Sequence, residues 1–378
     1  MSGTARHYFP GNNTVRGFFS YYPYILEQKQ AHKIYCLKGG PGLGKSTLMK
    51  TIGQTLLGEG EDVDFLHCSS DPDSLDGILI RKKNVAMIDG TSPHVVDPLH
   101  PGAVDTILHL GDFWNEDGIR SKRQLILDTD ARLKTHYARA YGYLAAAGEL
   151  HKSLYQIYDR WLEKPRMYKK AAAIINRELP HKKLSSQPGT VRKMFASALT
   201  PKGHVHFLPT LMDEASRVYL IEEPVGMNGG RLIQLFLDQA LQRGYDAECY
   251  YCAMDPDQKP EHLYIPQIKT AFVSSNDFHP LDPRDFRGKV SVIDMRKWIH
   301  IPEETSDQYD ALDMTELLSQ LLSKAFRCFR DAKADHDILE QLYQPHMDFS
   351  RLEPVKQKIL AEIRSLCPIQ PLVKPCEM

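Results

Sequence analysis

The chain has 378 residues, which at roughly 100–200 residues per domain predicts two or three domains. Hydrophobic residues make up 42 % of it and charged residues 25 %, with a formal net charge of −1. This composition is typical of a globular protein and excludes a largely disordered chain or one that binds polyanions in general. It therefore gives no indication of nucleic-acid binding.

The sequence carries no sign of secretion or of a membrane span. Its opening residues, MSGTARHYFPGN, contain no apolar segment, and no run of about 18 apolar residues occurs in the chain. We therefore expect a cytoplasmic protein with no membrane partner. The seven cysteines are scattered and odd in number, which indicates reduced thiols. Cys249 and Cys252 have CxxC spacing, but no second ligand pair accompanies them, and we interpret both as strand residues.

Blocks of the first half recur in the second half at an almost constant spacing. RHYFPGNNT, which starts at Arg6, is matched by RKMFASALT from Arg192, and VDFLHCSSDPD from Val63 is matched by AECYYCAMDPD from Ala247. Repetition over several separate blocks predicts a tandem duplication. We therefore predict two domains, over residues 1–190 and 191–378.

Within the first half, the predicted elements begin with a strand, KIYCL, at residues 33–37. A glycine-rich turn and an amphipathic helix follow it, and then come two further strands, DVDFLHC at 62–68 and NVAMID at 84–89. Apolar residues at three- and four-residue spacing predict a long helix and shorter helices between about residues 121 and 179. Strands that alternate with helices predict an α/β fold with a parallel sheet in each half and an appended helical region.

The glycine-rich turn matches G-x-x-x-x-G-K-[ST], the Walker A motif of P-loop NTPases, between a strand and a helix as that motif requires. Glycines let the backbone curl so that its N–H groups point at a phosphate, and the start of the helix adds a favourable field. A lysine in this position bridges phosphate oxygens, and the next hydroxyl joins the Mg²⁺ shell. The predicted nucleotide-binding residues are Gly39, Gly40, Pro41, Gly42, Leu43, Gly44, Lys45, Ser46 and Thr47.

A magnesium site needs a further oxygen ligand, and an aspartate at the end of an apolar strand commonly provides it. Asp89 ends VAMID and is our candidate partner of Ser46 in binding Mg²⁺. The next residue is Gly90, where many ATPases have a water-activating glutamate. The sequence therefore predicts slow hydrolysis of ATP.

Other polar residues follow the second and third strands, at the edge where α/β sheets bind ligands. Asp71 and His94 are the candidates to orient a water or an acceptor hydroxyl, together with Lys45 as the catalytic cation. The competing interpretation of Asp71 is a turn, because the second half retains the same Asp-Pro-Asp sequence at 255–257.

The second half lacks the residues that give the first loop its chemistry. Lys45 and Ser46 correspond to Gly229 and Gly230, and Asp89 corresponds to Ser274. Glu222 and Glu223 add negative charge where phosphate would lie. We therefore predict a structural or regulatory second half, in which Arg231 is the residue available to compensate in part.

FPGNNTVRGFFS, GGPGLGKST, CSSDPDSLDG and IDGTSPH together resemble a family of bacterial P-loop ATPases, chiefly from Gram-positive organisms, that are built as two tandem P-loop halves. The resemblance extends over nearly the whole chain. It implies ATP binding and a P-loop α/β fold in both halves, without a settled substrate. The second half of that family commonly carries its own phosphate loop, and EEPVGMNGGR departs from this pattern.

These observations predict a protein that binds Mg-ATP and hydrolyses it slowly at one active site in the first half. Two alternatives stay open. One is an ATP-dependent kinase for a small molecule or nucleotide, because the helical region is suited to form a lid. The other is a nucleotide-dependent switch or scaffold without enzymatic activity, in which the helices dock a protein partner.

Overall fold

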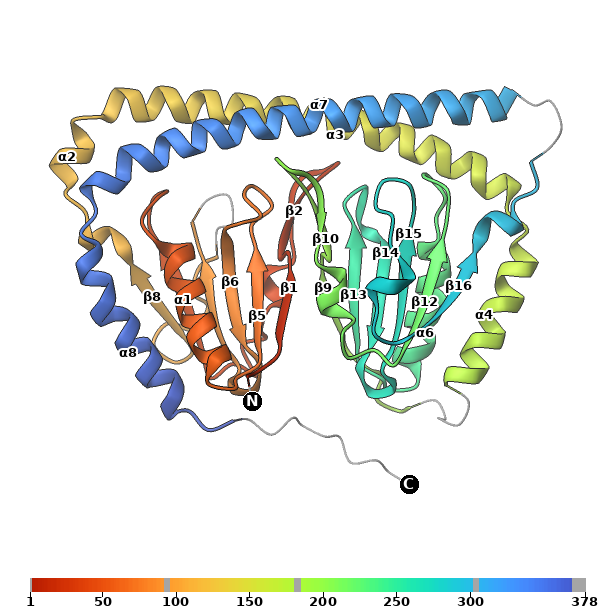
Figure 1. Ribbon diagram of the computed structural model, residues 1–378, viewed down its shortest axis with the longest axis horizontal. Coiled ribbons are helices and arrows are strands. Elements are labelled where there is room, and N and C mark those ends of the chain that lie inside the picture. Colours follow the sequence, from red (N-terminus) through yellow and green to blue (C-terminus); the bar gives the residue numbers. More distant parts are fainter. Residues whose placement is uncertain (1, 92–95, 180–184, 302–305, 369–378) are drawn as a thin grey trace. The chain divides into compact units, whose positions relative to one another are not determined.

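The computed structural model describes residues 2–91, 96–179, 185–301 and 306–368. The chain forms two compact units, and each draws residues from both sides of the predicted boundary at residue 190. Unit 1 comprises residues 1–11, 20–138 and 328–378, and unit 2 comprises residues 12–19 and 139–327. Each unit is α/β and is built on one six-stranded sheet (Figure 1).

The sheet of unit 1 has the strand order β1-β5-β6-β7-β4-β8. The strands β4 and β7 are direct parallel neighbours, so their carboxyl ends meet at one edge, and β8 pairs in parallel with the other side of β4. The strands are β1 (Ala5–Tyr8), β4 (Lys33–Lys38), β5 (Val63–His67), β6 (Leu75–Ile80), β7 (Val85–Asp89) and β8 (Asp105–His109).

The predicted parallel sheet needs one correction, because β6 runs antiparallel to both of its neighbours, β5 and β7. All six residues of β6 are buried. The sequence LDGILI mixes an aspartate and a glycine with apolar residues, so neither an alternating nor a continuous apolar pattern marks it as a strand. The sheet is therefore mainly parallel, with one antiparallel strand.

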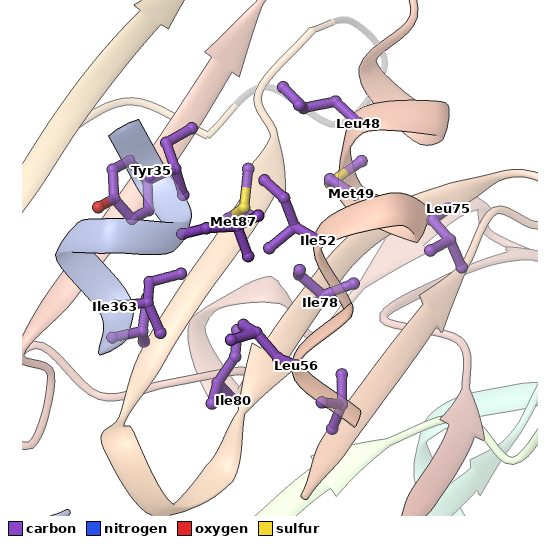
Figure 2. Packing of buried hydrophobic residues seen from close by; sticks show 14 of the residues in the cluster. Tyr35, Leu48, Met49, Ile52, Leu56, Leu75, Ile78, Ile80, Met87 and Ile363 are labelled. Carbon is purple, nitrogen blue, oxygen red and sulfur yellow. The ribbon is translucent and has the colours of Figure 1, made fainter. Parts of the chain in front are cut away.

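Two helices bury their apolar faces in the core of unit 1. Leu48, Met49, Ile52 and Leu56 of α1 (Lys45–Gly58) pack with Ile359, Leu360 and Ile363 of α8 (Leu352–Ser365) and with side chains of the sheet. Figure 2 shows Ile52 and Leu56 lying among Ile78, Ile80 and Met87. Full burial of an aliphatic side chain contributes about 1.5–3 kcal/mol, so this core holds α1 firmly on the sheet. The helix start that follows the glycine loop is fixed as a result.

The sheet of unit 2 repeats the same order, β9-β13-β14-β15-β12-β16, with β14 again antiparallel to both neighbours. The central strand β12 pairs in parallel with β15 and β16, and β13 pairs in parallel with β9. The strands are β9 (Val191–Met194), β12 (Arg217–Glu222), β13 (Ala247–Cys252), β14 (Asp255–Ile265), β15 (Thr270–Ser275) and β16 (Lys289–Asp294).

In unit 2, α6 (Gly230–Gln242) follows β12 as α1 follows β4 in unit 1. Its apolar face is buried, and Phe236 stacks on Phe272 of β15 with ring centroids 4.0 Å apart. Helix α4 (Lys164–Glu178) packs beside α6 and buries Met167, Ala171 and Ile174. Both halves of the sequence thus contribute to this unit, because α4 precedes residue 190.

Two long helices, α3 (Arg123–Trp161) and α7 (Ser306–Tyr343), each contribute residues to both units. The long helix and the shorter one that follows it agree with the helical region predicted between residues 121 and 179. The remaining helices and strands are short: β2 (Gly11–Thr14), β3 (Gly17–Ser20), α2 (Glu116–Arg120), β10 (Ser197–Thr200), β11 (Gly203–His206), α5 (Leu208–Leu211) and 3-10 turns at Tyr22–Tyr24, Arg81–Lys83, Leu110–Phe113, Pro266–Ile268, Pro283–Asp285, Met295–Trp298, Gln344–His346 and Phe349–Arg351.

Among the described residues, no helix combines the length and the apolar character that crossing a bilayer requires.

Candidate functional site

The predicted phosphate loop connects β4 to α1 in unit 1. Gly42 (φ 70°) and Gly44 (φ 82°) have left-handed backbone conformations that residues with a side chain rarely adopt. Gly44 is the N-cap of α1, so the first N–H groups of this helix open towards the loop. The glycines at these positions are therefore required by the turn itself, and the turn is anchored by a buried helix.

Lys45 reaches back over the loop that precedes it. Its Nζ donates hydrogen bonds to the carbonyl oxygens of Gly39 (2.6 Å) and Gly40 (2.9 Å), and it lies 3.5 Å from Asp89 Oδ2. The side chains of Lys45 and Asp89 are only 10 % and 15 % exposed, so this charge pair is partly shielded from water. The structure thus brings the predicted catalytic cation and the predicted metal ligand together.

Asp89 occupies the carboxyl end of β7, beside the carboxyl end of β4. Its Oδ1 accepts a hydrogen bond from the backbone N–H of Thr91 (2.9 Å), and Thr91 Oγ1 donates to Gly39 O (2.9 Å). These bonds tie the end of β7 to the start of the loop and orient the Asp89 carboxylate. The other oxygen of that carboxylate is directed to Lys45.

Ser46 is oriented by a strand that the sequence did not predict. Its Oγ accepts a hydrogen bond from the backbone N–H of Leu75 (2.9 Å), which begins β6. A serine hydroxyl has one proton and two lone pairs, so this bond leaves the proton and one lone pair for another partner. Ser46 and Asp89 thus offer oxygen ligands of the kind that Mg²⁺ prefers.

The end of α7 and the residues after it cover the outer side of the loop, which the sequence did not predict. A Cβ atom at Gly42 would lie 3.0 Å from Gln344 Cγ and 3.0 Å from Glu340 Cα, and one at Gly40 would lie 3.2 Å from Tyr343 Cε1. Leu43 is fully buried, in a small cluster with Leu110 and Met347. No signal in the loop sequence could have revealed this cover, because its residues come from the far end of the chain.

The two other candidates for catalysis have different outcomes. Asp71 holds its own turn: Oδ1 accepts from Asp73 N (3.2 Å), and Oδ2 accepts from Ser74 Oγ (3.0 Å) and lies 3.4 Å from Lys333 Nζ. Among the described residues, Asp71 has no interaction with Lys45 or Asp89, and this agrees with the turn interpretation. His94 lies outside the described residues.

A further carboxylate, that of Asp76, is buried on β6, the strand that pairs with β7. Burial raises the pKa of Tyr22 well above its ordinary value, and the charges of Asp76 and Asp89 raise it further. Both carboxylates therefore act on the same phenol. The sequence could have indicated this carboxylate, because Asp76 lies within the otherwise apolar segment LDGILI. An aspartate is seldom buried without a specific role.

In unit 2, the loop that follows β12 is bonded by a side chain of the loop itself, that of Glu223. The carboxylate of Glu223 accepts hydrogen bonds from the backbone N–H of Gly229 and from Ser274 Oγ, and Lys259 Nζ lies 3.7 Å from its Oε1. Both charged side chains are almost completely buried. Burial alone would lower the pKa of Lys259, but the charge of Glu223 and its other neighbours outweigh this effect and raise it. Gly229 and Ser274 thus bind a carboxylate of the chain itself.

The structure gives ordinary roles to the other residues considered in the second half. Arg231 bonds Asp159 Oδ1 (2.6 Å) and also Tyr155, so the loop's buried cation is Lys259 and not Arg231. Cys249 and Cys252 lie on β13 and are buried free thiols, which confirms their interpretation as strand residues. Burial raises the pKa of Cys249 to about 12, so this thiol stays protonated.

Comparisons of this chain with protein-family models, with curated proteins and with solved structures give no match.

Proposed function

We propose that this protein is a Mg-ATP-binding P-loop NTPase with slow turnover, and that its one active site is built on residues 39–47. The observation that carries the proposal is the position of Lys45, whose ammonium group lies 3.5 Å from Asp89 Oδ2 at the adjoining ends of two parallel strands. P-loop NTPases use a lysine and an aspartate in this way to hold phosphates and the metal.

The contacts of Lys45 are compatible with phosphate binding. Its present acceptors are the carbonyl oxygens of Gly39 and Gly40, which are neutral. A triphosphate offers anionic oxygens, which attract the ammonium group more strongly than neutral carbonyl oxygens do. Lys45 would therefore exchange these carbonyls for phosphate oxygens, while the first N–H groups of α1 hold the anion from the other side.

Ser46 and Asp89 would hold the magnesium ion. Their hydroxyl and carboxylate oxygens match the hard ligands that Mg²⁺ takes, together with phosphate oxygens and water. When bound, the ion would neutralise charge on the phosphates. Leu75 and Thr91 orient the two ligands through their backbone N–H groups, which is the usual role of residues around metal ligands.

Slow turnover follows from the residue after Asp89. A Cβ atom at Gly90 would lie 2.8 Å from Val96 O and 3.2 Å from Lys38 Nζ, so there is no room for a glutamate side chain in this backbone position. Water would have to be activated by another group. The nearby buried carboxylate of Asp76 favours a second candidate function, phosphoryl transfer to a hydroxyl of a small molecule or nucleotide, because kinases use a carboxylate base.

We further propose that the two halves arose by tandem duplication within the bacterial P-loop ATPase family that the motifs resemble. The shared strand order of the two sheets supports this origin. The second half would be structural or regulatory, because the Glu223 carboxylate already uses the N–H group and the hydroxyl that would face a phosphate and its metal.

The test measures ATP binding by calorimetry and phosphate release in magnesium buffer, for the wild type, Lys45→Ala and the control Lys50→Ala. Lys50 is on the same helix but bonds Asp73 O outside the loop. We expect Lys45→Ala alone to abolish binding and turnover, and equal binding in all three proteins would refute the proposal. Transfer of phosphate to nucleosides, sugars or coenzyme precursors, lost in Asp76→Asn, would identify the kinase instead.

A further inference from the structure

Unit 2 contains a cavity of about 150 Å³ at the carboxyl ends of β12, β13 and β15. Ligands of open α/β sheets bind at this edge, outside the carboxyl ends of the strands. Val225 and Gly226 of the loop after β12 form part of its wall, beside residues of the antiparallel strand β14. The cavity thus borders the position at which a P-loop domain would hold nucleotide, but its lining differs from that of a phosphate-binding loop.

Two buried charges of opposite sign face this cavity from one strand. Lys259 and Glu261 both belong to β14, and both line the cavity. Lys259 Nζ donates to Met227 O (3.3 Å) and lies 3.7 Å from Glu223 Oε1. An ammonium group has three N–H donors, so these contacts leave it donor capacity for an acceptor in the cavity.

Glu261 likewise retains acceptor capacity. Its Oε1 lies 3.2 Å from His279 Nε2, and its Oε2 lies 3.6 Å from His262 Nε2, which is too long for a hydrogen bond. Burial alone would raise the pKa of Glu261, but the charge and hydrogen bond of His279 and its other neighbours hold it well below its ordinary value. The side chain is therefore a carboxylate at neutral pH, and two oxygens with about four lone-pair sites can accept from a further donor.

His151 of α3 adds a polar group that the protein does not use. Its side chain is 9 % exposed and lines the cavity, and among the described residues its ring has no hydrogen-bond partner. Burial, with a smaller contribution from the charge of nearby Lys259, lowers the pKa of His151 to about 3, so the ring is neutral. A neutral imidazole offers one donor and one acceptor to a ligand in the cavity.

The rest of the wall is largely apolar. Phe278 follows β15, and Leu318, Leu322 and Phe326 recur on α7 at a spacing that places them on one face of this helix. A cavity of about 150 Å³ admits a molecule of the size of benzene in other proteins. The cavity therefore combines an ammonium, a carboxylate and a neutral imidazole with room for a small apolar group.

We propose that this cavity binds a hydrophobic α-amino acid, with its carboxylate on Lys259 and His151, its ammonium on Glu261 and its side chain against α7. The two charges of the ligand complement two fixed charges that already face the cavity, and this gives the zwitterion an advantage over a plain acid or amine of the same shape. The site is separate from residues 39–47, and the proposal does not depend on ATP binding.

The test uses calorimetry on the full chain without nucleotide, with L-leucine, L-valine and L-phenylalanine as ligands. Glycine, 4-methylpentanoate and 3-methylbutylamine are the controls for the side chain, the ammonium and the carboxylate. We expect at least one hydrophobic amino acid to bind at least tenfold more tightly than all three controls. Absence of binding for all three amino acids, or equal binding of the plain acid or amine, would overturn the proposal.

A pair of variants on α7 locates the binding. Ser319 lines the cavity at its exposed side, whereas its neighbour Gln320 is exposed and does not line it. Ser319→Trp would fill the mouth while leaving the buried charges intact, so we expect affinity for the amino acid to fall at least tenfold, and Gln320→Trp to bind as the wild type does. Circular dichroism checks that both variants fold. Equal affinities in the two folded variants would refute this cavity as the site.

Discussion

The loops after β4 and after β12 occupy the same position in two sheets of the same strand order, yet their charges are arranged in opposite ways. In unit 1 the loop carries the cation, Lys45, and its backbone N–H groups face outwards from the start of a helix. In unit 2 the loop carries the anion, Glu223, and the cation Lys259 comes from β14. The first arrangement suits an external anion, whereas the second already contains one.

The two loops therefore satisfy their polar groups in different ways. A loop without its lysine and serine would leave N–H groups unpaired, which costs free energy when they are buried. Glu223 removes that cost by accepting from Gly229 N and Ser274 Oγ. The carboxylate in turn needs Lys259, because a buried charge is tolerated only when it is paired. The second loop is therefore stabilised by bonds between its own polar groups and other side chains of unit 2.

The largest effect should come from removing the buried cation. Lys259→Met leaves Glu223 and Glu261 without their ammonium partner, and we expect it to lower the free energy of unfolding by about 3–5 kcal/mol. Lys45→Met should cost only about 1 kcal/mol, because Asp89 keeps its bond from Thr91 N and its contact with solvent. Chemical denaturation measures both, and equal losses would remove the proposed contrast between the loops.

Two glycines of unit 2 provide the second comparison, one in the loop after β12 and one at the start of β11. A Cβ atom at Gly226 (φ 85°) would lie 2.5 Å from Leu154 Cβ, so we expect Gly226→Ala to cost about 2–3 kcal/mol of stability. At Gly203 (φ 94°) no atom lies within 4 Å, and Gly203→Ala should cost only the backbone strain, about 1–2 kcal/mol. Thermal unfolding distinguishes them. A Gly226→Ala variant no less stable than Gly203→Ala would contradict the packing of that loop.

Unit 2 should also respond to acid through His151. The pKa of this residue is lowered to about 3 in the fold, against 6.5 ordinarily, so the unfolded chain binds one more proton between these values. Its stability contribution is therefore intact above pH 6.5 and is lost as the pH falls towards 3, by about 2 kcal/mol at pH 5. We expect His151→Leu to gain about that amount relative to the wild type between pH 7.5 and pH 5. A pH-independent difference would contradict a buried neutral ring.

A small effect on stability is expected at Ser46. Ser46→Ala leaves the N–H of Leu75 without its acceptor, so we expect a loss of about 1 kcal/mol, together with a weaker dependence of ATP affinity on magnesium. Thr51→Ala is the matched control, because the Thr51 hydroxyl lies on the same helix and, within the described part of the chain, bonds only Thr47 O. Magnesium titrations of ATP binding measure the effect, and an unchanged dependence in Ser46→Ala would exclude this hydroxyl from the metal shell.

Much of the first sheet could be predicted from the sequence, because its signals are local. KIYCL, DVDFLHC and NVAMID are short apolar runs, and β4, β5 and β7 fall within them or extend them by a residue. The strand β6 was missed because Asp76 and Gly77 interrupt its pattern and because its antiparallel pairing depends on neighbours in the fold. Local propensity does not contain this information.

The site was predictable to the same extent. The positions of Lys45 and Asp89 follow from a motif and from a strand end, and the structure brings the two together. The cover over the loop by Tyr343 and Gln344 depends on packing between segments about 300 residues apart, which a single sequence does not reveal. The same holds for Lys259, since nothing near it in the sequence indicates that it faces Glu223.

The most direct test of the proposed difference between the two loops is the stoichiometry of Mg-ATP binding, measured by calorimetry on the full chain. We predict that each chain binds one nucleotide, that Lys45→Ala abolishes this binding and that Gln320→Trp leaves it unchanged. Two nucleotides per chain would contradict the self-occupied loop of unit 2, and no nucleotide, or binding that survives Lys45→Ala, would contradict the phosphate site of unit 1.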